Sequence, residues 1–174
     1  MKGIVLDLQD LGSLGEFLAA IATIATLFYL AIQIRQSTRT TQASAHDAIL
    51  AQWREHLRET FTASSVNLEI WRRGLSDFAS LDASEKARFT FILSQEQLFI
   101  ENMVQQHQRG NIDSDLMQPW LDYFCREIRT PGGAIWWEMV SPSLNPAFVG
   151  IMQEQINSAA GTPNLVEAIP VFKY

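Results

Sequence analysis

The chain has 174 residues, of which 13 are basic and 19 acidic, and its formal net charge is −6. A negative balance argues against a nucleic-acid-binding surface, so we expect no nucleic-acid partner. The single cysteine, Cys125, excludes an intramolecular disulfide, which is consistent with a reducing compartment. The length suits one soluble domain of roughly 120 residues together with an anchor.

The anchor is the stretch FLAAIATIATLFYLAI, residues 17–32, which contains no charge and no proline. Between Leu11 and Ile34 only Glu16 and Gln33 interrupt the apolar run. At about 1.5 Å per residue a helix of this length crosses a hydrocarbon core of about 30 Å. We therefore predict a transmembrane helix that contacts membrane lipids.

Two other interpretations of this stretch remain open. One is a buried core helix of a soluble protein. The other is a cleaved signal peptide, because Ala43-Ser44-Ala45 resembles a cleavage site. The acidic segment before the apolar run and the two cations that follow it, Arg35 and Arg39, favour an uncleaved anchor.

The orientation follows from the distribution of cations. Lys2 is the only basic residue before the anchor, whereas Arg35, Arg39, Arg54 and Arg58 follow it. The positive-inside rule then predicts a short N-terminus outside and a C-terminal domain in the cytoplasm.

The two faces of the predicted helix differ in side-chain size. Small residues let helices approach closely in lipid, so the small face predicts a homo-oligomer or a partner transmembrane helix. This helix-association face comprises Gly12, Gly15, Ala19, Ala22, Thr26 and Gln33. The opposite, bulky face comprises Leu14, Phe17, Ile21, Ile24, Phe28 and Ile32.

Glu16 and Thr23 lie beside the small face and permit a second interpretation, in which these helices surround a polar axis. An ionisable residue within a membrane is a functional candidate, so the chain would then be a homo-oligomeric channel or transport component. The simpler interpretation places Glu16 at the hydrated outer interface, where its charge suits the helix N-terminus.

The remaining chain has the periodicity of helices. The absence of glycine and proline from Gln33 to Phe61 predicts a helix continuous with the anchor, with a bend in the Ser/Thr-rich residues 37–41. A short helix over residues 66–75 should end at Gly74 in the C′ position. Asp82 or Ser84 should cap a long central helix that ends near Gly110.

Three further features follow the central helix. Asp113 or Ser114 should begin a helix in which Pro119 is tolerated if it lies in the first turn. Thr130–Gly133 should be a turn before a short helix or turn with Trp136 and Trp137. Asn145-Pro146 should open the last helix, and proline should keep the tail after Gly161 from being helical.

Candidate chemical groups are few. The histidines, His46, His56 and His107, belong to no zinc or di-iron spacing, and no nucleotide-binding or hydrolase motif is present. Cys125 has the neighbours of a core residue. We therefore expect no catalytic residue, no metal and no cofactor.

Charged residues suggest pairing and surface contacts. Glu96 and Glu101 lie among apolar residues of the central helix, and we expect structural pairing with Arg72, Arg73 or Arg126. Two clusters suit an anionic lipid head group or an acidic partner: Arg35 with Arg39, and Trp71 with Arg72 and Arg73. The second cluster is better explained as a helix end whose arginines face the helix dipole.

Four segments resemble those of a family of bacterial single-span inner-membrane proteins with a helical cytoplasmic domain. They are Gly15-Glu16 before the apolar span, Tyr29 to Thr38, Trp71 to Leu75, and Pro131-Gly132-Gly133 with Trp136-Trp137. The resemblance implies a location in the bacterial inner membrane and no particular activity.

Together these patterns predict an all-α protein in which one transmembrane helix precedes a bundle of four to six helices. The expected organisation is a lead-in over residues 1–10, a transmembrane helix over 11–35, a cytoplasmic domain over 36–160 and a tail over 161–174. The expected function is non-enzymatic assembly or interaction, with self-association through the anchor, in the manner of an accessory subunit of a membrane complex.

Overall fold

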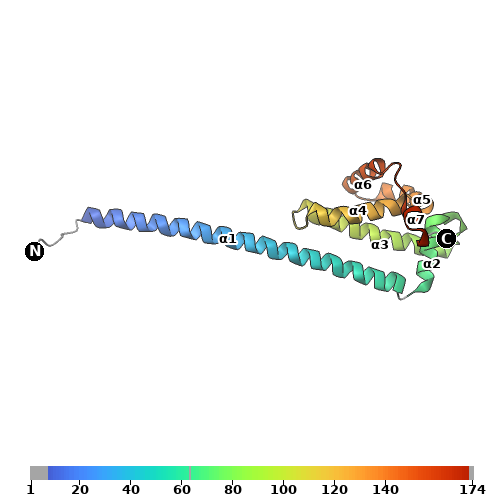
Figure 1. The fold of residues 1–174 in the computed structure, drawn as a ribbon, viewed down its shortest axis with the longest axis horizontal. Helices are drawn as coiled ribbons and strands as arrows, with labels where there is room; N and C mark the ends of the chain where they lie inside the picture. The colour runs from blue at the N-terminus through green and yellow to red at the C-terminus, as the bar shows by residue number, and fades with distance from the viewer. Residues whose placement is uncertain (1–7, 63, 173–174) are drawn as a thin grey trace, which may run out of the picture. The chain divides into compact units, whose positions relative to one another are not determined.

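The computed structural model describes residues 8–62 and 64–172, and these residues form seven α-helices without a strand (Figure 1). The predicted all-α class is confirmed. The first seven residues of the predicted lead-in and the last two of the predicted tail lie outside the described range. The chain divides into two compact units, Met1–Ala43 and Ser44–Tyr174.

The first helix, α1, runs without interruption from Leu8 to Leu57 over 50 residues. The expected bend in the Ser/Thr-rich stretch does not break it. The hydroxyls of Thr38, Thr40 and Thr41 each donate to the carbonyl four residues earlier, at 3.0–3.1 Å, so these side chains bond within the helix. A π-helical turn, Arg58–Thr62, follows α1.

The central helix of the second unit is α3, Ala83–Gln108. As expected, Asp82 caps it, and Glu85 completes a capping box by accepting from the Asp82 N–H at 2.9 Å. Gly110, with a φ of 73°, follows its last turn and supplies the left-handed conformation that commonly ends a helix. One face is buried, and it consists of Phe89, Ile92, Leu93, Glu96, Gln97, Phe99, Ile100, Met103 and Val104.

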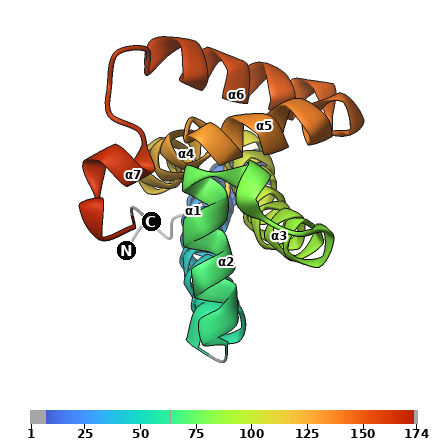
Figure 2. The ribbon, with the colours of Figure 1, turned by 90° about the vertical axis from the view of Figure 1, so that its right-hand side faces the viewer.

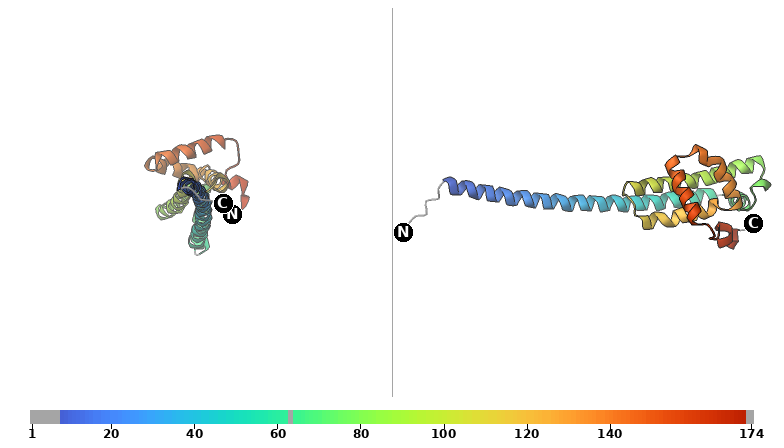
Figure 3. Two further views of the ribbon diagram at one scale, coloured as in Figure 1. Left: turned by 90° about the vertical axis from the view of Figure 1, so that its left-hand side faces the viewer. Right: turned by 90° about the horizontal axis from the view of Figure 1, so that it is seen from above.

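The helix α4, Ser114–Ile128, lies beside α3 (Figures 1 and 3). Pro119 is its sixth residue, so this proline lies beyond the first turn, and the condition under which a proline is tolerated without loss of a helical bond is not met. Its missing N–H leaves the Asp115 carbonyl without a helical partner. Both residues are exposed, so solvent can satisfy that carbonyl.

The end of α1 packs on both of these helices through Trp53. The Trp53 ring lies 5.1 Å from the Phe99 ring of α3 and 4.9 Å from the Trp120 ring of α4, measured between centroids. Ile49, one turn earlier, is buried as well. Aromatic contacts of this kind contribute about 0.5–1.5 kcal/mol each beyond the area that they bury.

Two glycines let α2, Ser65–Ser76, approach its neighbours closely. Gly74 lies inside this helix, so its expected C′ position is wrong, and Asp77 is the C-cap. A Cβ on Gly74 would lie 2.3 Å from the Phe89 ring of α3. A Cβ on Gly132 would lie 1.7 Å from the Gly74 carbonyl oxygen. Three helices therefore meet where only glycine fits.

Gly132 belongs to α5, Pro131–Val140, so the expectation of a turn over Thr130–Gly133 is wrong. Thr130 caps this helix by accepting from the Gly133 N–H at 3.1 Å, and Pro131 takes the first helical position. Proline suits that position because its missing N–H has no helical partner there. The adjacent tryptophans Trp136 and Trp137 are buried in the helix.

The last two helices, α6 (Pro146–Ser158) and α7 (Leu165–Ala168), lie against α4 (Figure 2). Asn145 caps α6, as expected, and Phe148 and Met152 are buried. The expectation of a non-helical tail is wrong, because α7 and a 3₁₀ turn, Pro170–Phe172, occur within it. Two more 3₁₀ turns, Phe78–Ser80 and Ser141–Ser143, precede α3 and follow α5.

The contact between Gly132 and Gly74 predicts a large effect of one methyl group. Gly132→Ala should lower the stability of the full-length protein in detergent by about 1–3 kcal/mol or more, because backbone atoms would have to move. Thermal unfolding followed by circular dichroism measures this.

Gly150→Ala is the matched control. A Cβ on Gly150 meets nothing within 4 Å, and alanine is the better helix former, so this change should leave stability equal or slightly higher. Equal melting temperatures for the two variants would contradict the close contact of α2 and α5.

Candidate functional site

Three ionisable side chains from three helices meet in the interior of the second unit. His56 comes from α1, Glu96 from α3 and Glu127 from α4, and we call them the carboxyl–histidine cluster. Glu96 is 2% exposed and Glu127 is 0% exposed. Carboxyl groups are almost never buried this completely unless they are paired, so this cluster is the most unusual chemical feature of the domain.

His56 joins α1 to α3. Its Nε2 lies 3.2 Å from Oε1 of Glu96, and the His56 side chain is 10% exposed. The expected pairing of Glu96 with an arginine is therefore wrong. Arg73 instead bonds to Glu85, and Glu101 accepts from Gln97 at 2.6 Å.

Glu127 is held by a tryptophan. The Nε1–H of Trp71 donates to Oε1 of Glu127 at 2.6 Å, with both side chains buried. The Trp71 ring lies between two phenylalanines, at 5.4 Å from the Phe61 ring and 5.1 Å from the Phe172 ring. The C-terminal segment thus packs, through Phe172, against the tryptophan that donates to this carboxyl.

Thr60 carries the hydrogen-bond chain toward the surface. Its Oγ1 lies 3.3 Å from Nδ1 of His56 and 3.4 Å from Oε1 of Gln95. A threonine hydroxyl has one hydrogen, so it can donate to only one of these two acceptors at a time. The direction of this chain therefore depends on which nitrogen of His56 carries the proton.

Burial controls the charge of the cluster. It raises the pKa of Glu96 to about 7, with a smaller opposing effect of its interaction with Glu127. Burial also raises the pKa of Glu127 well above its usual range, and the nearby Glu96 adds to this, while the Trp71 N–H opposes it. Burial lowers the pKa of His56, against the opposing charge of Glu127. The cluster therefore resists a net charge.

The second oxygen of each carboxyl, Oε2, is buried without a hydrogen-bond partner among the described residues. Glu96 and Glu127 influence each other's protonation, and when one of them holds a proton a side-chain hydrogen bond between the two carboxyls contributes to both pKa values. Two like charges so close in a dry interior cannot both persist, so one carboxyl should hold a proton at neutral pH.

A surface cavity of about 340 Å³ gives solvent access to the cluster. Its lining includes His56 and, around it, Gln52, Glu55, Glu59, Gln95, Leu98 and Phe99. Thr60, His56 and Glu96 have the connectivity of a nucleophile–base–carboxylate triad. However, Thr60 is 6% exposed and lies outside this lining, so a substrate carbonyl would not reach its oxygen.

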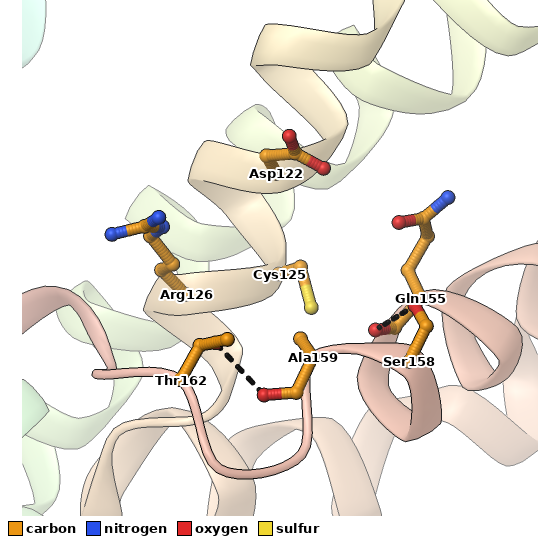
Figure 4. Close-up of a pocket in the computed structure, with 7 residues that line it drawn as sticks. All are labelled: Asp122, Cys125, Arg126, Gln155, Ser158, Ala159 and Thr162. Atoms are coloured by element: carbon orange, nitrogen blue, oxygen red, sulfur yellow. Dashed lines mark hydrogen bonds between the residues drawn. The ribbon is translucent and has the colours of Figure 1, made fainter.

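A smaller pocket of about 220 Å³ lies between α4 and the end of α6 (Figure 4). Cys125 points its sulfur into this pocket, where Asp122 and Arg126 also contribute to the wall. Burial raises the pKa of the Cys125 thiol, so it stays protonated and weakly nucleophilic. The expected role as a core residue agrees with its burial.

Within the described residues, no group of three His, Cys, Asp or Glu side chains has an arrangement that holds a metal ion. The two other histidines lie apart from the cluster. His46 is exposed on α1, and the Nδ1 of His107 lies 3.0 Å from the Ile112 carbonyl at the end of α3.

The residues predicted for the anchor lie, from Gly12 onward, on the exposed part of α1. One helix of the described chain is long and apolar enough to span a membrane by length and composition. Every residue from 12 to 41 is exposed, and so are both predicted faces, including Gly15, Glu16 and Arg35. Of the second predicted contact cluster, Trp71 lies in the core, which leaves Arg72 and Arg73, both half-buried, for a surface contact.

Sequence reasoning singled out Glu96 but missed Glu127 and its relation to His56. A signal for Glu127 does exist, because it lies between Phe124 and Ile128 on the apolar face of α4. A carboxyl at such a position predicts a buried acid. The signal for His56 is weaker, since its neighbours on α1 are largely polar.

No protein family, curated protein or solved structure matches this chain. The resemblance to a family of bacterial inner-membrane proteins therefore stays a prediction.

The bond between Trp71 and Glu127 predicts that Trp71→Phe is costly. The change leaves a buried carboxyl oxygen without its donor, which typically costs about 1–3 kcal/mol in addition to the lost ring area. Trp136→Phe is the matched control, because Trp136 is equally buried and its Nε1 has no hydrogen-bond partner among the described residues. Chemical unfolding of the full chain in detergent should show the larger loss for Trp71→Phe, and equal losses would contradict the importance of the bond.

The raised pKa values of Glu96 and Glu127 predict that stability falls as the pH rises from about 6.5 to 9. A carboxyl whose pKa is higher in the folded state loses its contribution to stability as the pH rises from its unfolded to its folded pKa. For Glu96 this loss is nearly complete above its folded pKa of about 7, and the fall at higher pH comes from Glu127, whose pKa is also raised well above its usual range. His56 has the opposite sign, with a contribution lost only below its ordinary pKa of 6.5, so this window isolates the carboxyls. Where the folded state binds one proton more than the unfolded state, the free energy of unfolding falls by about 1.4 kcal/mol per pH unit.

Glu127→Gln should weaken this pH dependence because glutamine is neutral and can still accept from Trp71. Glu154→Gln, at an exposed position of α6, should leave it unchanged. Unfolding free energies measured across the window test both variants. A wild-type stability that is constant or rises from pH 6.5 to 9 would contradict the burial of protonated carboxyls.

Proposed function

We propose that this chain is a non-enzymatic, membrane-anchored interaction protein that self-associates through the apolar part of α1. In this proposal the protein lies in a bacterial inner membrane, with its N-terminus outside and its helical domain in the cytoplasm. One form of this function is that of an accessory subunit in a larger membrane complex.

The observation that carries the proposal is the complete exposure of an apolar helix. Phe17, Phe28 and Ile34 are 63%, 69% and 67% exposed, in a stretch in which every residue from 12 to 41 is exposed. Continuous apolar surface of this extent is rare on a soluble monomer and is typical of contact with lipid or a partner. A membrane supplies lipid contact to the bulky face.

The small face supports contact with a second helix. A Cβ on Gly12 or Gly15 would meet nothing within 4 Å, so the backbone is open to close approach. The hydroxyls of Thr23 and Thr26 donate to the carbonyls of Ala19 and Ala22, each at 2.8 Å. These hydroxyl hydrogens are used within the helix, which favours packing in lipid over a hydrated pore.

The test is oligomeric mass after mild detergent extraction, by native mass spectrometry of the full chain. Gly15→Leu and Ala19→Leu should each weaken self-association at least tenfold, because a bulky side chain separates the helix backbones. Ile24→Leu, a volume-conserving change on the bulky face, is the control and should retain the oligomer. An unchanged mass for both small-face variants would contradict association through this face.

The same preparation tests the channel alternative. A channel predicts conductance in liposomes that Glu16→Gln alters, whereas the proposed interaction protein predicts no conductance. Conductance that depends on Glu16 would therefore replace the proposal with the alternative.

A further inference from the structure

We propose that Glu96 and His56 form a proton-binding site in which His56 passes one exchangeable proton between the buried Glu96 carboxyl and the surface cavity. The ligand is a proton, and Glu127 is its fixed, protonated neighbour. This site is independent of the proposed self-association, since all of its residues lie within Ser44–Tyr174.

The first step of the argument is the charge of the cluster. Glu96 and Glu127 are at most 2% exposed, and burying a charge without compensation is far more costly than burying a neutral acid. A neutral cluster requires two protons in addition to the one on the neutral imidazole. One is on Glu127, and the other is shared between Oε1 of Glu96 and Nε2 of His56, which are 3.2 Å apart. The shared proton is the exchangeable one, because His56 lines the cavity.

The second step is the direction of the hydrogen bonds when this proton is present. The Glu96 acid donates to Nε2 of His56, Nδ1–H of His56 donates to Thr60, and the Thr60 hydroxyl donates to Oε1 of Gln95. Within these three bonds each donor has one acceptor and each hydrogen is used once. When the exchangeable proton is bound, His56 is therefore in its Nδ1–H tautomer.

Release of the proton reverses this chain. The Glu96 proton moves to Nε2 of His56, and the Nδ1 proton leaves to water in the cavity, so that one proton enters and one leaves the imidazole. Glu96 becomes a carboxylate that accepts from Nε2–H, and Nδ1 becomes an acceptor for the Thr60 hydroxyl. The bond from Thr60 to Gln95 is then lost, because the hydroxyl has a single hydrogen.

The groups around the site support this assignment. From α4, Tyr123 stays a neutral phenol, because burial and then the charges of Glu127 and Glu96 raise its pKa. From α2, the neutral Trp71 indole donates to Glu127. The π-helical turn contributes Thr60 and, at the surface, Glu59, whose charge favours a proton on His56.

The tautomer of His56 provides the test. Nitrogen-15 NMR of the histidine-labelled full chain in detergent micelles distinguishes the Nδ1–H form from the Nε2–H form. We expect His56 to change from the first to the second as the pH rises from 6 to 9. An unchanging tautomer, or protonation of His56 to an imidazolium without a change of tautomer, would overturn the proposal.

Two variants locate the exchangeable proton. Glu96→Gln should abolish the pH-dependent change of tautomer, whereas Glu127→Gln should retain it, because glutamine is also a neutral neighbour. Glu154→Gln is the control and should behave like the wild type. If Glu96→Gln does not fold, the wild-type titration and Glu127→Gln still decide: loss of the change in Glu127→Gln would assign the exchangeable proton to Glu127 and overturn the proposal.

Discussion

The domain depends on one constraint: two carboxyl groups from neighbouring helices occupy its dry interior, where they must remain nearly uncharged. Glu96 and Glu127 are held in different ways, one by His56 and the other by Trp71. Together these bonds connect α1 to α3 and α2 to α4. The cluster therefore ties together the four helices that surround it, and a change in its charge acts on all of them.

The close packing of α2 against α3 and α5 has a separate origin. Gly74 and Gly132 allow α2, α3 and α5 to approach until backbone meets backbone and ring, with no room for a methyl group. A region packed so tightly has no room for water. Glu96 and Glu127 are buried as well, and a charge on either is costly because the dielectric response of a protein interior is weak.

Much of this fold could be predicted from the sequence because local signals and packing agree. The capping box at Asp82 and the glycine at the end of α3 both mark the helix that the structure shows. Elsewhere a tertiary contact overrides the local signal. Gly74 has the sequence pattern of a helix end, yet it lies inside α2, where it allows close contact with α3 and α5. Pro131 has the pattern of a turn, yet it begins α5, because the Thr130 side chain caps the N-terminus of that helix.

The candidate site was harder to predict because its bonds join residues far apart in the sequence. Glu96 was recognisable as an acid in an apolar helix, but its partner His56 lies 40 residues earlier. Periodicity reports which face of a helix is buried and not which side chains meet across it. The pairing of Glu127 with Trp71, 56 residues apart, is likewise set by how the helices pack.

Stability alone does not require carboxyl groups at these positions. Glutamine would accept the Trp71 bond or the His56 bond without the cost of a charge, and apolar residues of similar volume often stabilise a core more than buried ionisable groups do. What glutamine cannot do is exchange a proton. The properties that only the carboxyls provide are therefore protonation and the reversal of the hydrogen-bond chain through His56 and Thr60, whose observed distances permit both directions. Because His56 belongs to the last turn of α1, the state of that proton acts directly on how this end of α1 is held in the bundle.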